Sequence, residues 1–193
     1  MSNKFLIVGL GNIGLEYRHT RHNIGFDIAE AFVYKNNGTF TSGRLAEVAE
    51  LKYKGRQVIV IKPTTYMNLS GRAVLYWMLK EKIPPENILV LVDDIALPIN
   101  KLRLRPSGSD AGHNGLKSIT QMLESDKYPR LRFGIGDNSP KGMQIDYVLG
   151  KWTKEEEPVI KNKLEKCIEL IESFIFIGIQ QTMNQYNKLE FPL

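Results

Sequence analysis

Short apolar runs alternate along the chain with segments of helical periodicity. The runs are continuous and rich in β-branched residues, which is typical of strands buried on both faces, and they lie at 5–8, 58–61 and 87–92. The intervening segments carry apolar residues three or four positions apart, which predicts helices over 24–34, 70–82 and 115–124. Strands that alternate with helices in this way form a largely parallel sheet with helices on both faces.

Other patterns extend this sheet and close the chain. Residues 46–53 and 57–62 predict a hairpin, and alternating residues at 101–105 and 130–133 predict two further strands. Thr153 and Glu156 form a capping box before a long helical stripe that Gly178 divides, so the C-terminus is helical. Without an internal repeat or a linker, the prediction is one α/β domain over 1–193, with a mixed, twisted sheet covered by helices on both faces.

Composition and charge narrow the class of protein. Apolar residues make up 42% of the chain and charged residues 24%, as in ordinary globular proteins. The apolar runs fall short of the ~20 residues of a membrane span, and the N-terminal run is too short for a signal peptide. One cysteine, Cys167, fits a reducing cytoplasm, and its place on an apolar helical stripe predicts a buried thiol.

The positive charge is concentrated in one part of the chain. The net charge is +5, and residues 101–151 hold nine Lys or Arg against five Asp or Glu, so this part carries +4. Such a local excess favours an anionic partner, with nucleic acid as the leading candidate. An ordinary basic surface explains the same charge equally well.

The stretch after the first strand reads Gly9-Leu10-Gly11-Asn12-Ile13-Gly14, which matches the dinucleotide fingerprint. Its context is wrong for that function, because the following residues lack the stripe of a helix that would hold a pyrophosphate. The acidic residue expected about 20 positions later is also missing. A dinucleotide-binding domain therefore remains the weakest of the alternatives.

Polar residues instead follow several predicted strands. In open α/β sheets, ligands bind beyond the carboxyl ends of the strands, so we expect these side chains to meet at one edge. They are Asn12, Tyr17 and His22 after the first strand, Tyr66, Met67 and Asn68 after the second, Asp93 and Asp94 after the third, and His113 and Asn114 in a later glycine-rich loop.

These residues suit hydrolysis by a directly activated water. A histidine oriented by a carboxylate is a general base worth roughly 10²–10⁴-fold in rate, and asparagine amides can stabilise an oxyanion. The spacing of histidine, cysteine and acidic residues matches no zinc motif, and no serine-hydrolase or phosphate-loop motif is present. Taken singly, each residue also has a structural explanation, such as a helix cap at Asn114 or an ordered loop at Asn68.

Basic residues alternate on two of the predicted strands. Arg103 and Arg105 share one strand face with Lys101, and Arg130 shares a face with Arg132. A solvated face is the ordinary explanation. Guanidinium pairs beside a polar cleft would equally suit phosphate groups.

Taken together, the motifs resemble the bacterial-type peptidyl-tRNA hydrolase family, in order and over nearly the whole chain. The matching blocks are Gly9–Gly14, Thr20–Gly25, Lys62–Gly71, Gly112–Lys117, Arg130–Gly136 and Tyr147–Lys151, together with Tyr17. The resemblance implies hydrolysis of the ester between a peptide and tRNA, which recycles tRNA from aborted translation. It also implies a cytoplasmic monomer without a cofactor or metal.

The resemblance also implies a role for each matching residue. His22 would activate water and Asp93 would orient it. Asn12, Asn68 and Asn114 would hold the peptide, the water and the carbonyl oxygen. Which asparagine holds which group stays open at this point. The cleft would be lined by Tyr17, Tyr66, Met67 and His113, and the tRNA 5′ phosphate would be bound by Arg105 and Arg132.

The chain departs from the family pattern at three positions. Ile13 stands where the family usually has proline, Ala111 where it has glycine, and Ala96 where it has a second aspartate. The last change leaves the orienting role to Asp93 with Asp94. A second hypothesis is a non-catalytic RNA-binding protein on the same fold, of which the family holds a plant organellar example; the retained His22, Asp93 and asparagines argue against it.

Overall fold

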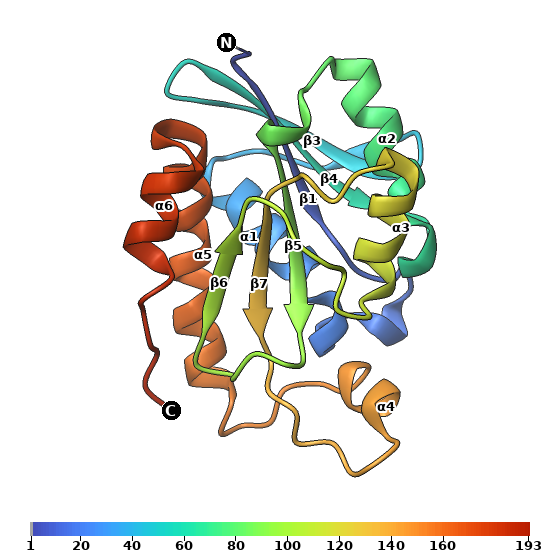
Figure 1. Cartoon of the computed structure of the whole chain (residues 1–193), viewed down its shortest axis with the longest axis vertical. Coiled ribbons are helices and arrows are strands. Elements are labelled where there is room, and N and C mark those ends of the chain that lie inside the picture. Colours follow the sequence, from blue (N-terminus) through green and yellow to red (C-terminus); the bar gives the residue numbers. More distant parts are fainter. Residues whose placement is uncertain (1) are drawn as a thin grey trace.

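One seven-stranded mixed sheet runs through the computed structural model, which describes residues 2–193 (Figure 1). In spatial order the strands are β2 (Thr41–Gly43), β3 (Ala46–Tyr53), β4 (Arg56–Pro63), β1 (Lys4–Gly9), β5 (Ile88–Asp94), β7 (Arg130–Gly134) and β6 (Leu102–Arg105). The four central strands, β4, β1, β5 and β7, are parallel, whereas the remaining strand pairs are antiparallel. The predicted mixed α/β sheet is therefore confirmed.

Helices cover both faces of the sheet (Figure 1). They are α1 (Ile24–Lys35), α2 (Ser70–Glu81), α3 (Asn114–Leu123), α4 (Gln144–Val148), α5 (Glu157–Ile177) and α6 (Ile179–Tyr186). Short 3₁₀ turns lie at η1 (Leu15–Tyr17), η2 (Arg21–Asn23), η3 (Met67–Leu69) and η4 (Pro85–Asn87). Among residues 2–193, none of these helices has the length and apolar content needed to cross a membrane.

Alternating side chains divide the core into two layers. On β1, Leu6 and Val8 pack with α2 and α3, whereas Ile7 faces α1 and α5 on the opposite side. All three side chains are fully buried. A strand buried on both faces needs this continuous apolar run, which explains why the central strands stand out in the sequence.

The glycines after β1 serve helix packing. A Cβ on Gly9 would lie 2.3 Å from the backbone oxygen of Gly25, in the first turn of α1. The chain turns through η1 and η2 before α1 begins at Ile24, so no helix opens directly after the glycines. This arrangement differs from the dinucleotide fingerprint, in which the helix N-terminus follows the glycine turn.

The helical boundaries agree with the sequence patterns except in detail. The capping box is confirmed, since the Thr153 N–H donates to Glu156 at 2.8 Å and the Glu156 N–H to Thr153 Oγ1 at 3.3 Å. The predicted cap of α3 is wrong, because the side chain of His113, and not that of Asn114, accepts hydrogen bonds from backbone N–H groups of the first turn. On α2, Leu79 is 63% exposed, whereas Trp77 is buried. The sequence patterns missed β2 and α4.

The basic strands also differ from expectation. Lys101 precedes β6 and pairs with Glu190, so it does not belong to the row of strand arginines. Arg130 is fully buried, and its guanidinium donates to the carbonyls of Gly108 at 2.8 Å and Asp126 at 2.6 Å. A buried guanidinium whose donors are satisfied by backbone carbonyls has a structural role, since it links the segments that carry those carbonyls.

Candidate active site

A cavity of about 500 Å³ opens at the carboxyl ends of the parallel strands. Because β4, β1, β5 and β7 run in one direction, the segments that follow them meet at this edge, as the sequence predicted. Most of the predicted site residues line the cavity: Asn12, His22, Tyr66, Met67, Asn68, Asp93, Asp94, His113, Asn114 and Arg132. Tyr17 and Arg105 are not among the lining residues.

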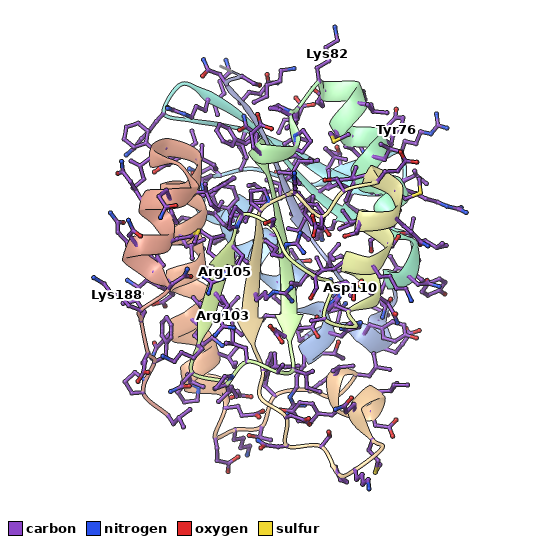
Figure 2. All side chains as sticks on the ribbon, in the orientation of Figure 1. Tyr76, Lys82, Arg103, Arg105, Asp110 and Lys188 are labelled. Carbon is purple, nitrogen blue, oxygen red and sulfur yellow. The ribbon has the colours of Figure 1, made fainter. Side chains whose placement is uncertain are left out.

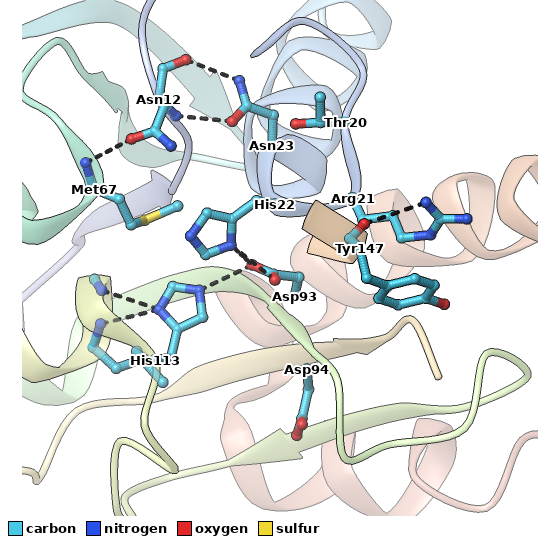
Figure 3. Close-up of polar contacts among 12 residues, drawn as sticks. Asn12, Thr20, Arg21, His22, Asn23, Met67, Asp93, Asp94, His113 and Tyr147 are labelled. Carbon is cyan, nitrogen blue, oxygen red and sulfur yellow. Dashed lines mark hydrogen bonds and ion pairs between the residues drawn. The ribbon is translucent and has the colours of Figure 1, made fainter. Parts of the chain in front are cut away.

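The centre of the site is a carboxylate between two imidazoles (Figure 3). His22, in η2, lies with Nδ1 at 3.0 and 2.9 Å from the two oxygens of Asp93, at the end of β5. A carboxylate accepts only, so Nδ1 carries the proton and Nε2 keeps a lone pair. In residues 2–193, His22 Nε2 has no hydrogen-bond partner.

His113 is the second imidazole, a role that the sequence did not reveal. Its Nε2 lies 2.9 Å from Asp93 Oδ1, while its Nδ1 accepts from the backbone N–H groups of Gly115 and Leu116 at 3.1 and 3.4 Å. These two backbone donors place the ring proton on Nε2, where it is donated to Asp93. His113 thus caps α3 and holds the carboxylate in one orientation.

The surroundings of Asp93 and His22 shift the pKa of each group. Burial alone would raise the pKa of Asp93, but the charges and hydrogen bonds of His113 and His22 outweigh it and hold this pKa below its usual range. Burial lowers the pKa of His22, yet the charge of Asp93 and its hydrogen bond bring the net pKa above the ordinary value. Asp93 therefore stays ionised and makes His22 a stronger base.

The same trio also has the spacing of a metal site, since its donor atoms all lie within 4.8 Å of one another. The chemistry of His113 does not fit this role. A metal at Nε2 would require the proton to move to Nδ1, where two backbone N–H groups already donate. The residues present therefore fit a hydrogen-bonded base better than a metal centre.

Asn12 is held by a second polar network above His22 (Figure 3). Its side-chain oxygen accepts from the Met67 N–H at 2.8 Å, and its backbone exchanges two hydrogen bonds with the Asn23 side chain at 2.8 and 2.9 Å. Because the oxygen is occupied, the amide nitrogen of Asn12 is the group left for a ligand. Asn23, which directly precedes α1, makes no side-chain cap bond to this helix and orders Asn12 instead.

The remaining residues of this edge differ in solvent exposure and backbone conformation. Asn68, Asn114 and Tyr66 are exposed, and Tyr66 shows 56% of its surface. Met67 is buried at 4% and forms the cavity floor beside Asn12. Ala111 adopts a φ of 49° in the loop before His113, a left-handed conformation that favours glycine.

Asp94 does not share the orienting role with Asp93. It accepts from the Ala96 N–H at 2.9 Å, and its carboxylate lies 3.8 Å from the Arg132 guanidinium. Arg132 also donates to the Ser109 carbonyl at 2.6 Å. Arg132 is thus a cation in the wall of the cavity that is anchored by the Ser109 carbonyl and has only a long contact to Asp94.

Tyr17 and Arg105 lie outside the cavity lining. The Tyr17 carbonyl accepts from Thr20 at 2.8 Å, which shapes the turn that leads to His22. Arg105 is exposed on β6 (Figure 2). The β6–β7 register places Arg103 opposite Arg132, so Arg103, Arg105 and Arg132 form one surface, hereafter the arginine face.

The other wall of the cavity comes from a part of the chain that the sequence left unassigned. It is formed by residues in and next to α4, namely Gln144, Ile145, Val148 and Leu149. Ile145 is 75% exposed, so this wall presents apolar surface to solvent. A five-residue helix has too few turns to give a periodic signal, which is why the pattern missed it.

Three comparisons with known proteins identify the family of this chain. A family model described as peptidyl-tRNA hydrolase matches residues 6–192. The chain is 56% identical to a peptidyl-tRNA hydrolase of Phocaeicola vulgatus over 185 residues, covering 96% of this chain and 99% of the relative. It is 53% identical to a peptidyl-tRNA hydrolase of Porphyromonas gingivalis over 184 residues, covering 95% and 100%.

The solved structures give the same result for the fold. The crystal structure of peptidyl-tRNA hydrolase from Acinetobacter baumannii superposes with a TM-score of 0.92 at 33% identity, covering 98% of this chain and 97% of that one. This chain therefore belongs to the peptidyl-tRNA hydrolase family, and its reaction is the hydrolysis of the ester bond between peptide and tRNA.

Proposed function

We propose that His22 is the general base of this hydrolysis. The observation that carries the proposal is the orientation of its ring: Nδ1 faces Asp93 at 2.9 Å, so Nε2 is the basic atom on a residue of the cavity wall. Water between Nε2 and the ester loses its proton to His22 as its oxygen bonds to the carbonyl carbon. The Asp93 carboxylate stabilises the imidazolium that forms.

The second half of the reaction returns that proton. The tetrahedral intermediate collapses, the bond between the carbonyl carbon and the ribose oxygen breaks, and the imidazolium protonates the departing ribose oxygen. The products are the peptide acid and a tRNA with a free terminal hydroxyl. No covalent enzyme intermediate is needed, because water attacks the ester directly.

The three asparagines bind the peptide ester and the water. Asn12 presents its amide nitrogen, because its oxygen is occupied by the Met67 N–H, so it suits a substrate carbonyl oxygen. Asn68 and Asn114 line the cavity with exposed amides, which offer both a donor and an acceptor. Tyr66 and Met67 contribute the apolar contacts of the peptide.

Arg132 and Arg105 bind the tRNA phosphate. Both belong to the arginine face, which extends from the cavity wall to the sheet edge. A phosphate approaching Arg132 would replace the distant Asp94 contact of 3.8 Å with a charge-assisted hydrogen bond. Tyr17 supports the turn before His22 through its backbone.

The protein acts as a cytoplasmic monomer. Every residue assigned to the reaction comes from one chain, and the single cysteine, Cys167, is buried as a free thiol, which suits a reducing compartment. Sedimentation equilibrium should give the mass of one chain. A dimer whose dissociation abolishes turnover would contradict the monomer.

The decisive experiment is turnover of the His22→Ala variant with N-blocked peptidyl-tRNA and free aminoacyl-tRNA side by side. We expect kcat to fall by about 10²–10⁴-fold with an unchanged melting temperature. The matched control is His19→Asn, because His19 lies three residues earlier, is 68% exposed, and has a φ of 58° that asparagine tolerates. Near-normal turnover by His22→Ala would show that another group is the base.

A further inference from the structure

Arg21 stands directly before the base and is buried despite its charge. Only 6% of its surface is exposed, whereas Arg103 and Arg105 are exposed. Taking a guanidinium out of water costs several kcal/mol unless an anion and hydrogen bonds replace the solvent. The partners of Arg21 therefore indicate what its burial achieves.

All the polar partners of Arg21 beyond its own turn come from one later stretch of chain. Its Nη2 donates to Glu156 Oε2 at 2.8 Å. Its Nη1 donates to the Tyr147 carbonyl at 3.3 Å (Figure 3). Its backbone N–H donates to the Gly150 carbonyl at 2.9 Å, and Thr20 forms a β-bridge with Lys151. The start of the turn that carries the base, at Thr20 and Arg21, is thus bonded to residues 147–156.

Two aromatic rings complete the enclosure of Arg21. The guanidinium carbon lies 4.3 Å from the centre of the Tyr147 ring and 5.3 Å from the centre of the Trp152 ring. A planar guanidinium can lie over a ring while its edge binds a carboxylate, which the compact ammonium of lysine cannot do. The geometry is therefore specific for arginine.

The same stretch continues into the wall of the cavity. We name residues 144–156 the α4 segment. Gln144, Ile145, Val148 and Leu149 of this segment line the cavity, while Tyr147, on the other side of α4, lies against Arg21. The Tyr147 hydroxyl donates to the Ile135 carbonyl at 2.7 Å, which ties the segment to the residue that follows β7.

We infer that Arg21 is a positioning residue that couples the α4 segment to His22, so that the cavity wall and the base are set together. This inference rests on the proposed role of His22. Arg21 is not among the residues that line the cavity, and it acts through the turn that it shares with the base. A shift of the wall is transmitted to the imidazole because Arg21 and His22 are adjacent in the same 3₁₀ turn.

The coupling predicts an effect on the chemical step. A misplacement of about 1 Å at a reacting group can cost about 100-fold in rate. Removing the Arg21 contacts should therefore lower kcat more than it changes KM, because Arg21 is adjacent to the base in η2, whereas Asn68 and Asn114 lie on other segments. The contact between His22 and Asp93 should also weaken, so the acidic limb of the pH–rate profile should move to lower pH.

The first test is Arg21→Lys, which keeps the charge and loses the planar fork. We expect kcat to fall about ten-fold or more, KM to change by less than about three-fold, and the acidic limb to move to lower pH. Arg56→Lys is the matched control. Its guanidinium also lies over a ring, 5.1 Å from Phe176, but its strand β4 begins at the opposite end of the sheet.

A second variant displaces Arg21 without removing any of its partners. A Cβ on Gly150 would lie 2.9 Å from Arg21 Nη1 and 3.2 Å from the Tyr147 carbonyl, so Gly150→Ala pushes the guanidinium out of its place. We expect the same loss in kcat and the same movement of the acidic limb. This variant also covers the case in which Arg21→Lys fails to fold.

The outcomes separate a positioning role from a structural one. If both variants melt at lower temperature but keep the wild-type kcat per folded molecule and the wild-type acidic limb, the coupling is wrong. If His22→Ala itself keeps turnover, the proposed base is wrong and the coupling falls with it. If His22→Ala is inactive while Arg21→Lys and Gly150→Ala keep the wild-type kcat and pH–rate profile, the coupling is wrong and the proposed base stands.

Discussion

The His22–Asp93–His113 cluster and the arginine face are both polar, yet they are built in opposite ways. In the cluster, Asp93 is 4% exposed and accepts from both imidazoles, and backbone N–H groups fix the second ring. On the arginine face, Arg103 and Arg105 are exposed on a sheet edge strand. The cluster is ordered before substrate arrives, whereas the face offers the exposed charges of Arg103 and Arg105 to a polyanion.

This difference predicts which kinetic constant each region controls. Groups held in place for the transition state act on kcat, since their geometry costs nothing to organise during the reaction. Exposed charges act on binding, and their contribution to the affinity falls with salt, because phosphate contacts release counterions. Each prediction below is a way to test that division.

The largest effect is expected for Asp93→Asn. The asparagine amide would donate toward one histidine, which favours the tautomer with the proton on His22 Nε2 and removes the base. We expect kcat to fall about 10³–10⁴-fold with little change in KM, as for an orienting aspartate. Single-turnover assays at saturating enzyme measure this directly. A loss confined to KM would place Asp93 in substrate binding.

The pH dependence is the next effect in size. The net shift places the pKa of His22 above its ordinary value of 6.5, and only the neutral ring accepts a proton. The value of kcat/KM should therefore fall about ten-fold per pH unit below that pKa. A profile of the free enzyme from pH 5 to 9 checks this. An acidic limb with its midpoint well below 6.5 would contradict the coupling to Asp93.

A smaller effect is expected for Arg132→Ala. Because Arg132 lies in the cavity wall and pairs only distantly with Asp94, we expect KM for peptidyl-tRNA to rise about ten-fold while kcat changes little. A substrate lacking the 5′ phosphate should be cleaved equally by variant and wild type. If the variant loses activity on both substrates, Arg132 serves the cavity and not the phosphate.

The smallest effect is expected for Arg105→Ala. The side chain is exposed, so its loss should raise KM only a few-fold and reduce the slope of log binding constant against log salt by about one. Filter binding of tRNA over a range of salt concentrations measures the slope. Lys188→Ala serves as a control for general surface charge, and an equal change in both variants would remove any special role of Arg105.

The sequence predicted the sheet and the edge at which the site lies, because buried strands and the polar residues after them leave local patterns. Asn12, His22 and Asp93 were identified in this way. The second contact of Asp93 was not predicted. His113 lies 20 positions from Asp93 in the sequence, and its ring also caps α3, so no local pattern indicates the contact. Arg21 was missed for a similar reason, as its partners lie 126 and 135 positions later.

That separation has a consequence for the synthesis of the protein. His22 and β1 are translated first, but the α4 segment that holds Arg21 is translated in the last third of the chain. While it is being made, the chain is itself a peptide esterified to tRNA, and so belongs to its own class of substrate. Because the base is set only when the distant segment docks, we expect the nascent chain to work below its full rate until that segment has been made.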